Sequence, residues 1–224
     1  MLYCAQTRQV RALQSKFEAL DGEKQQRILN AAMKEFASKG YDHASTNRIV
    51  EDAGIAKGLL FHYFKSKKQL FLYLYDRGLK LVTEEVLRGV DFTEPDFFQR
   101  VRKAQAAKIA LIRVYPDIMD FIKAAYLEES EAVKAELSER TQGLLALNYT
   151  KLFEGVDTAR FREGLDKNLV MKTIIWAYEG FANTHVEAIR RLETLNQDLT
   201  PMLAEADEYS SFLRKCFSRQ DEKA

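Results

Sequence analysis

The sequence predicts an all-α protein, and three observations support this fold class. Only 3 prolines and 10 glycines interrupt the 224 residues, whereas a chain of many short strands needs frequent turn residues. Ala, Leu, Glu, Lys and Arg, which favour helices, are plentiful. Apolar residues recur three and four positions apart along most of the chain, which is the spacing of one helix face. The length suits one large domain, or a small domain and a medium one.

The first well-defined helix covers residues 22–41. Asp21 is a suitable N-cap, and Glu23 matches the positive end of the helix dipole. Gly40 is a natural C-terminal stop. The preceding residues 8–20 fit either further helix or a loose segment. The apolar stripe of this helix consists of Ile28, Leu29, Ala32, Met33 and Phe36.

Two short helices follow the first one. Ser45 or Thr46 can cap a helix that ends at Gly54, the residue type that most easily adopts a left-handed conformation. A turn then leads into a second short helix, 57-KGLLFHYF-64. Ser66 can cap the next helix, which we expect from Lys67 towards Leu87.

The rest of the chain also has helical patterns. Residues 89–96 contain Gly89, Pro95 and several capping residues, which is typical of a boundary. Loops are expected at 154–164 and 194–201. Further helices are predicted at about 96–114, 116–128, 130–153, 164–192 and 201–218.

Composition and charge limit the function classes. The chain has no run of about 18 apolar residues, which is the length that would indicate a membrane span, and residues 1–16 lack the apolar core of a signal peptide. Cys4 and Cys216 lie near opposite ends and form neither a disulfide framework nor a metal site. We therefore expect a cytoplasmic protein without a membrane partner. Residues 1–90 carry 15 basic and 10 acidic residues and the remainder 19 and 23, which indicates two parts with different partners.

The two short helices and their glycine turn are typical of a helix-turn-helix. In that motif the N-terminal part of the second helix reads base edges in the major groove. Cations, hydroxyls and helix N-termini bind phosphate, and such groups stand at the helix starts on either side of the second helix. The DNA-binding candidates are Ser45, Thr46, Lys57, Gly58, Leu59, His62, Tyr63 and Lys67.

Residues 27–74 resemble the DNA-binding domain of the Tet repressor (TetR) family. The resemblance rests on 27-RILNAAMKEFASKGYDHAST-46 and 48-RIVEDAGIAKGLLFHYFKSKKQLF-71, whose motifs keep the same order and spacing. It covers about fifty residues, roughly a fifth of the chain. It implies a homodimeric repressor that binds a roughly palindromic operator through its N-terminal domain. It also implies an all-helical C-terminal domain that binds a small ligand, with its last two long helices forming a four-helix dimer interface.

Single positions of the motif both match and depart from the family. Family DNA contacts match Thr46, Lys57, Tyr63 and Lys67 by position. Leu59 stands where the family usually has Thr or Ser, and Ala56 where it usually has Ser. A leucine donates no hydrogen bond but can contact a thymine methyl group, so the departure concerns the sequence read rather than the docking mode.

The resulting division is an N-terminal extension at 1–21, a helix-turn-helix domain at 22–68, and a ligand-binding and dimerisation domain at 69–224. Ligand pockets are mostly apolar with a few polar groups, and we expect a small apolar or aromatic effector of unknown identity. The ligand-binding candidates are Tyr126, Tyr149, Trp176 and His185, although each also fits plain core packing. The dimer-interface candidates are Ile174, Tyr178, Phe181 and Phe212.

Other function classes have less support. The histidines His43, His62 and His185 have neither a paired carboxylate nor metal-ligand spacing, and the chain has no glycine-rich phosphate loop or nucleophile motif. We therefore expect no enzyme, no cofactor and no metal. Two alternatives stay open: an activator instead of a repressor, and a helical adaptor that does not bind DNA.

Overall fold

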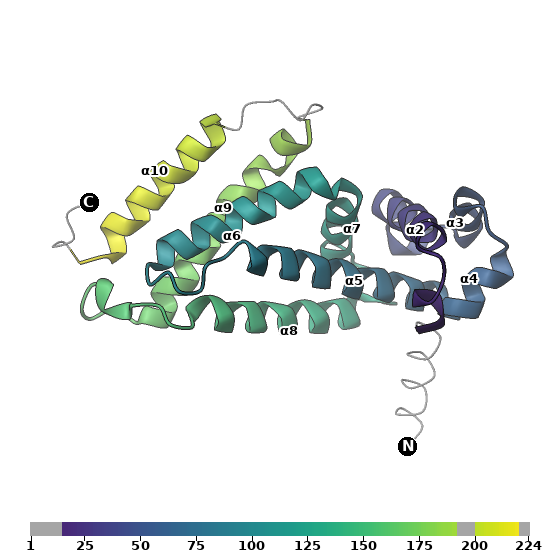
Figure 1. The fold of residues 1–224 in the computed structure, drawn as a ribbon, viewed down its shortest axis with the longest axis horizontal. Coiled ribbons are helices and arrows are strands. Elements are labelled where there is room, and N and C mark those ends of the chain that lie inside the picture. The colour runs from purple at the N-terminus through teal and green to yellow at the C-terminus, as the bar shows by residue number, and fades with distance from the viewer. Residues whose placement is uncertain (1–14, 192–199, 220–224) are drawn as a thin grey trace, which may run out of the picture. The chain divides into compact units, whose positions relative to one another are not determined.

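The computed structural model describes residues 15–191 and 200–219. Every element labelled in this part of the chain is helical, which confirms the all-α prediction (Figure 1). The side chains of Tyr149 and His185 lie outside the described residues. The helices are α2 (Gly22–His43), α3 (Thr46–Ala53), α4 (Lys57–Phe64), α5 (Lys67–Arg88), α6 (Phe97–Val114), α7 (Pro116–Tyr126), α8 (Lys134–Phe153), the 3-10 helix η1 (Thr158–Arg160), α9 (Lys167–Arg191) and α10 (Thr200–Phe217).

The chain forms two compact units that are discontinuous in sequence. Unit 1 contains residues 1–81 and 115–143, and unit 2 contains residues 82–114 and 144–224. Helices α5 and α8 each contribute residues to both units. The predicted end of the DNA-binding domain at residue 68 stays a prediction. The compact unit that contains this domain also includes α7 and half of α8.

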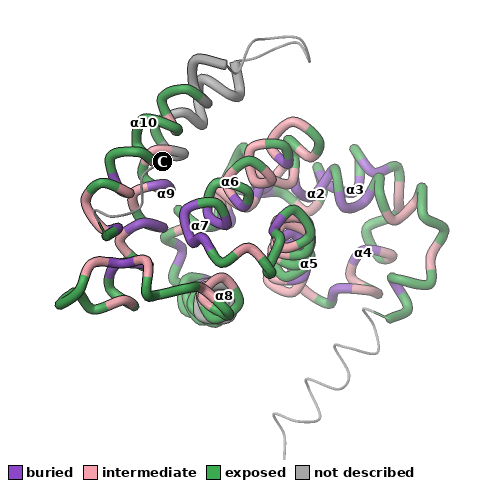
Figure 2. The backbone as a smooth tube through the Cα atoms, turned by 60° about the vertical axis from the view of Figure 1, so that its left-hand side comes forward, coloured by how far each residue is buried: buried purple, intermediate pink, exposed green. Residues whose placement is uncertain are grey.

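Unit 1 is built around α2, which packs mainly against α7 and α3. Phe36, Phe71 and Phe121 form the centre of its core, and each ring is almost completely buried. Phe71 lies edge-on to both of the other rings, at centroid distances of 4.9 Å to Phe36 and 5.3 Å to Phe121. Burying one such side chain stabilises the fold by about 1.5–3 kcal/mol. Figure 2 shows the buried positions of α2 and α3 alternating with exposed ones, as amphipathic helices require.

The helix ends in unit 1 follow the capping signals in the sequence. Asp21 accepts a hydrogen bond from the Lys24 amide and Ser66 accepts one from the Gln69 amide, so both predicted caps are confirmed. Gly54 ends α3 with φ 65°, in the left-handed region that favours glycine. Gly40 has φ 69° and interrupts α2, which continues for one short turn to His43.

Unit 2 has a separate core formed mainly by α6 and α9. Buried apolar residues include Phe97, Val101 and Ile174. Arg100 is completely buried, and its guanidinium donates to the main-chain carbonyls of Phe92, Glu94, Leu152 and Glu154. These bonds satisfy a charge that is otherwise costly to bury.

No helix in residues 15–191 or 200–219 is long and apolar enough to cross a membrane.

Candidate nucleic-acid interface

The α3–α4 corner has the geometry of a helix-turn-helix. The amide of Ile55 donates to the Val50 carbonyl at 3.0 Å, which closes the turn after α3. Helix α4 is held from inside by Leu60 and Phe64, which are 1% and 2% exposed. Its N-terminus has no side-chain cap, so tertiary packing rather than local bonding determines where α4 lies.

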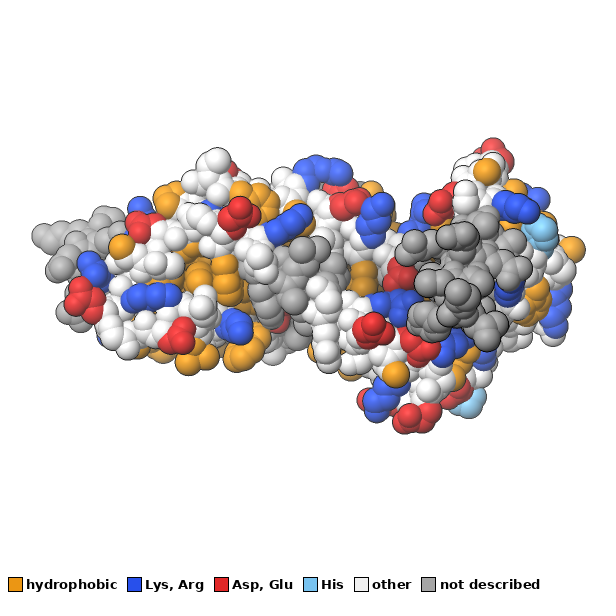
Figure 3. Space-filling view, turned by 90° about the horizontal axis from the view of Figure 1, so that it is seen from below, with side chains coloured by type: hydrophobic (Ala, Val, Ile, Leu, Met, Phe, Trp, Pro, Cys, Tyr) orange, Lys and Arg blue, Asp and Glu red, His pale blue; other side chains and the backbone are white. Residues whose placement is uncertain are grey.

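The outer side of α4 carries the five residues predicted there as DNA contacts. Lys57, Gly58 and His62 are exposed, while Leu59 and Tyr63 are partly exposed. Their accessibility agrees with the prediction, but their contact with DNA stays a prediction. Figure 3 shows Lys, Arg and His side chains, with some Asp and Glu among them, on the part of unit 1 that contains α3 and α4. This pattern supplies positive charge without a uniformly basic surface.

The start of α3 is fixed by two side chains. The Ser45 hydroxyl accepts a hydrogen bond from the Arg48 amide at 3.4 Å, and the Ser45 amide donates to a Glu35 carboxylate oxygen at 2.9 Å. Thr46 is partly exposed next to this cap. The helix start therefore presents the partly exposed Thr46 at the positive end of the helix dipole, which suits a phosphate oxygen.

The Lys67 side chain binds main-chain carbonyls within the protein, which the sequence did not indicate. Its ammonium donates to the carbonyls of Asp42 at 3.1 Å and Ala44 at 3.3 Å, and it lies 4.7 Å from the centroid of the Tyr41 ring. A lysine ammonium has three donors, so one remains for a phosphate. The predicted phosphate role stays untested, and the residue also holds the end of α2.

Residues that follow α7 hold the C-terminal end of α2, next to the start of α3. One carboxylate oxygen of Glu128 accepts the Tyr41 amide at 2.6 Å, and the other accepts the Ser130 amide at 2.9 Å. The Ser130 hydroxyl donates to the Asp42 carboxylate at 2.8 Å. A Cβ atom at Gly40 would lie 3.3 Å from the Glu128 carboxylate, so the close approach favours glycine. We call Glu128, Ser130 and Asp42 the corner clasp.

Sequence reasoning missed the corner clasp because Glu128 and Tyr41 are 87 positions apart. The acidic residues around 128 fitted a solvated helix end equally well.

A neighbouring ion pair joins Lys68 to Glu136, and the Lys68 ammonium holds the pKa of the Glu136 carboxyl below its ordinary value. Burial raises the pKa of the Tyr41 phenol, and the Asp42 and Glu136 carboxylates add to this effect.

The predicted ligand-binding residues stay a prediction. Tyr126 belongs to unit 1 and is 68% exposed, whereas Trp176 belongs to unit 2 and is 55% exposed. Tyr149 and His185 lie outside the described side chains. Unit 2 does contain buried polar atoms without a hydrogen-bond partner among the described residues, notably the Thr83 hydroxyl and the Gln105 side-chain carbonyl.

The predicted dimer residues fall into two groups. Ile174 and Tyr178 are buried inside unit 2 with 0% and 3% exposure. Phe181 is partly exposed and lies 5.4 Å from the Tyr209 ring centroid, and Phe212 is exposed. The interface itself stays a prediction. Other exposed large apolar residues of α9 and α10 are Trp176, predicted above as a ligand contact, and Leu169 and Tyr209, which the sequence argument missed.

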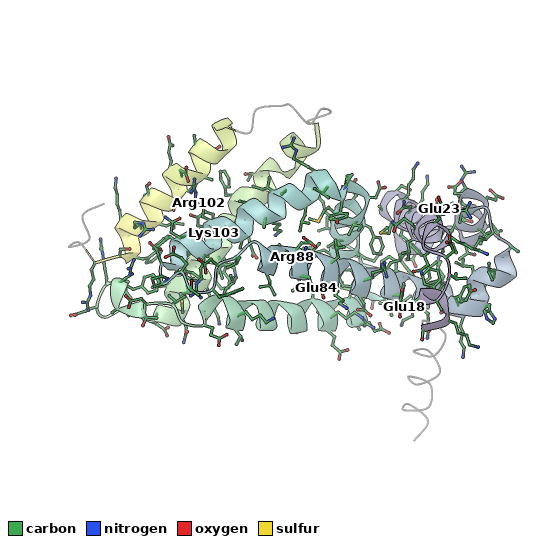
Figure 4. The ribbon with its side chains drawn as sticks, in the orientation of Figure 1. Glu18, Glu23, Glu84, Arg88, Arg102 and Lys103 are labelled. Carbon is green, nitrogen blue, oxygen red and sulfur yellow. The ribbon has the colours of Figure 1, made fainter. Side chains whose placement is uncertain are left out.

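Figure 4 shows charged side chains labelled on both units, including Glu84 and Arg88 of α5 and Arg102 of α6. Arg102 forms an ion pair with Asp207 at 2.7 Å, which joins α6 to α10 within unit 2.

In the described residues, no group of three His, Cys, Asp or Glu side chains is arranged to hold a metal ion.

Comparison with known proteins links this geometry to one family. Residues 28–74 match the family model for bacterial regulatory proteins of the tetR family. The chain is 21% identical over 169 residues to the Fatty acid metabolism regulator protein of Bacillus subtilis, a match that covers 73% of this chain and 84% of that protein.

Two solved structures have the same fold. A TetR family transcriptional regulator from Chloroflexus aurantiacus aligns with a TM-score of 0.68 and 22% identity, over 92% of this chain and 98% of that one. The transcriptional regulator FadR from Bacillus subtilis, in complex with stearoyl-CoA, aligns with a TM-score of 0.63 and 19% identity, over 84% of this chain and 96% of that one. At these identities the structural likeness applies to the fold.

Proposed function

We propose that this chain is a ligand-responsive transcriptional repressor, because residues 28–74 match the DNA-binding domain of the tetR family. The observation that carries the proposal is the construction of α4. Leu60 and Phe64 attach this helix to the core, while Lys57, Leu59 and Tyr63 are accessible on its outer side. An accessible helix fixed from inside is what major-groove reading requires.

Each protomer would insert α4 into the major groove. Lys57, Leu59 and His62 then face base edges, while Ser45, Thr46, Tyr63 and Lys67 face phosphates. Leu59 would contact a thymine methyl group rather than donate a hydrogen bond. Because phosphate contacts release counterions, affinity should fall steeply as salt increases.

We further propose a homodimer formed through α9 and α10. Leu169, Trp176 and Phe212 are 59%, 55% and 62% exposed, and large exposed apolar residues in a group are typical of interaction surfaces. Ile174 and Tyr178 would support this surface from the core without contacting the partner. Two-fold symmetry of the dimer then requires a roughly palindromic operator.

The effector that we propose is an acyl thioester. The support is the relative named as a fatty acid metabolism regulator and the FadR structure, which holds stearoyl-CoA. Within unit 2, the Thr83 hydroxyl and Gln105 carbonyl are buried polar atoms without a described partner. They are candidates for binding a polar group of the effector, because an unsatisfied buried polar atom is costly. The effector would release DNA only by binding the released arrangement more tightly.

The experiment starts from a randomised library of double-stranded DNA. The full-length protein should select a roughly palindromic duplex, and stearoyl-CoA should release it more strongly than free CoA does. Leu59→Ser should change which bases are selected more than it changes overall affinity. Selection of no duplex would contradict DNA binding and favour the adaptor alternative. A reporter that falls when the gene is deleted would favour an activator.

A further inference from the structure

Residues 15–20, of which 15–18 are helical, form an N-terminal turn before α2 and belong to the same compact unit as the helix-turn-helix. The Ala19 amide donates to the Ser15 carbonyl and the Leu20 amide to the Phe17 carbonyl, both at 3.1 Å. The side-chain amide of Gln25 then donates to the carbonyls of Glu18 at 3.0 Å and Leu20 at 2.8 Å. The turn is thereby fastened to α2, and Figure 4 labels its Glu18. It lies outside the family match, which begins at residue 28.

Phe17 points from this turn into a group of aromatic rings. It is completely buried. Its ring centroid lies 4.8 Å from that of Phe64, 5.6 Å from that of Tyr63 and 5.7 Å from that of Tyr73. The contacts with Tyr63 and Tyr73 are edge-to-face, an arrangement that adds to the stabilisation from burial alone. One side chain from the N-terminal turn therefore contacts both α4 and α5.

The last turn of α4 is held by Phe64, whose ring centroid also lies 5.2 Å from that of Tyr73 on α5. Helix α4 has eight residues, no side-chain N-cap, and two buried residues on its inner face. Lys65 follows it with φ 55°, a conformation that non-glycine residues adopt at some cost. Helices this short are unstable alone, so their position depends on tertiary contacts, which here include those of the Phe17 ring with Phe64 and Tyr63.

Tyr63 joins this packing to the proposed DNA surface. It is partly exposed, its ring packs edge-to-face with that of Phe17, and its hydroxyl forms no hydrogen bond with another described residue. A phenol in this position can bind water in the free protein and exchange that water for another acceptor when DNA binds. A phosphate oxygen is a suitable partner because the hydroxyl can donate to it.

We propose that Phe17 is a positioning residue for DNA binding, which holds the Tyr63 ring so that its hydroxyl meets a phosphate. This inference rests on the proposed function. Without the Phe17 ring, Tyr63 and the end of α4 gain freedom that must be lost again when DNA binds. Because residues in contact are commonly coupled, we expect Phe17→Ala to weaken DNA binding by about tenfold.

A double-mutant cycle tests this role directly. The probe is the duplex selected by the wild-type full-length protein, and the measurement is its dissociation constant at fixed salt. Tyr63→Phe removes only the hydroxyl, so it should weaken binding in the wild-type background. In the Phe17→Ala background the hydroxyl is no longer positioned, and the same change should have little effect. An equal loss in both backgrounds would overturn the inference.

Two further variants separate positioning from general stability. Phe121→Ala removes an equally buried ring of unit 1 that contacts Phe36 and Phe71. Measured where both proteins are folded by circular dichroism, it should keep wild-type affinity, and a loss equal to that of Phe17→Ala would contradict the proposal. Phe17→Leu retains most of the buried volume and provides the same cycle if Phe17→Ala does not fold. Failure of the wild type to select a duplex would instead overturn the proposed function.

Discussion

Helices α4 and α9 both carry apolar residues around much of their circumference, but they differ in how well sequence spacing identifies the inner face. In α4 the pair at 60 and 64 is buried and the residues between them are accessible. In α9 the residues predicted for a subunit interface, Ile174 and Tyr178, are buried in the core of unit 2, whereas Trp176 is exposed. A long helix with several apolar stripes can turn any of them inward, so spacing alone does not decide which one does.

The largest expected effect concerns the inner face of α4. Leu60→Ala should lower the free energy of unfolding by about 2–5 kcal/mol, because the side chain is almost completely buried and its removal leaves a cavity. Chemical denaturation followed by circular dichroism measures this. Leu59→Ala is the matched control and should cost less than about 1 kcal/mol. Equal losses would remove the distinction between the two faces of α4.

The corresponding test on α9 and α10 uses charge at the exposed positions. Phe212→Glu should produce monomers at micromolar concentration with little change in unfolding, since the side chain is 62% exposed in the protomer. Sedimentation velocity measures the assembly. Ile174→Ala should instead destabilise the protomer, by about 2–5 kcal/mol. A Phe212→Glu protein that sediments as the wild type does would exclude this residue from the dimer interface.

An intermediate effect is expected at Glu128, which follows α7 and binds the C-terminal end of α2. Glu128→Gln removes the charge from a carboxylate that accepts two main-chain amides. Hydrogen bonds to charged groups contribute about 1.5–3 kcal/mol, so unfolding should become easier by roughly that amount. Glu129→Gln is the control, because Glu129 is exposed and pairs only with Lys134 among the described contacts. Equal stabilities of the two variants would mean that the corner clasp does not contribute.

The smallest effect is the pH dependence of the Lys68–Glu136 pair. The ammonium lowers the folded-state pKa of Glu136 below its ordinary value of 4.5. The stabilisation is therefore present above pH 4.5 and is lost as the pH falls through the lowered pKa. Both side chains are more than a third exposed, so we expect less than about 1 kcal/mol. The difference in unfolding free energy between wild type and Glu136→Gln should be larger at pH 7 than at pH 3.

Local signals predicted most of unit 1. The caps at Asp21 and Ser66, the glycine that ends α3 and the limits of α4 all depend on residues close in sequence, and the structure confirms them. The contacts that hold this corner in place depend on distant residues. Nothing near Tyr41 indicates that Glu128 binds its amide, because a carboxylate at a helix end is normally solvated.

The N-terminal turn illustrates the same limit. The sequence left residues 8–20 open between helix and loose chain, because a single apolar Phe17 has no periodic partners to indicate packing. Its burial follows from aromatic residues on α4 and α5 that lie more than forty positions away. In unit 2, the buried unpartnered atoms of Thr83 and Gln105 have no signal in the sequence either.

The discontinuity of unit 1 has a consequence for the growing chain on the ribosome. The family match ends at residue 74, yet the core beneath it is completed by Phe121 and the rest of α7. A nascent chain, or a fragment cut at residue 81, would expose the faces of Phe36 and Phe71 that Phe121 covers. The helix-turn-helix should therefore acquire its native structure only after synthesis has passed α7. A shorter fragment should tend to aggregate or recruit a chaperone.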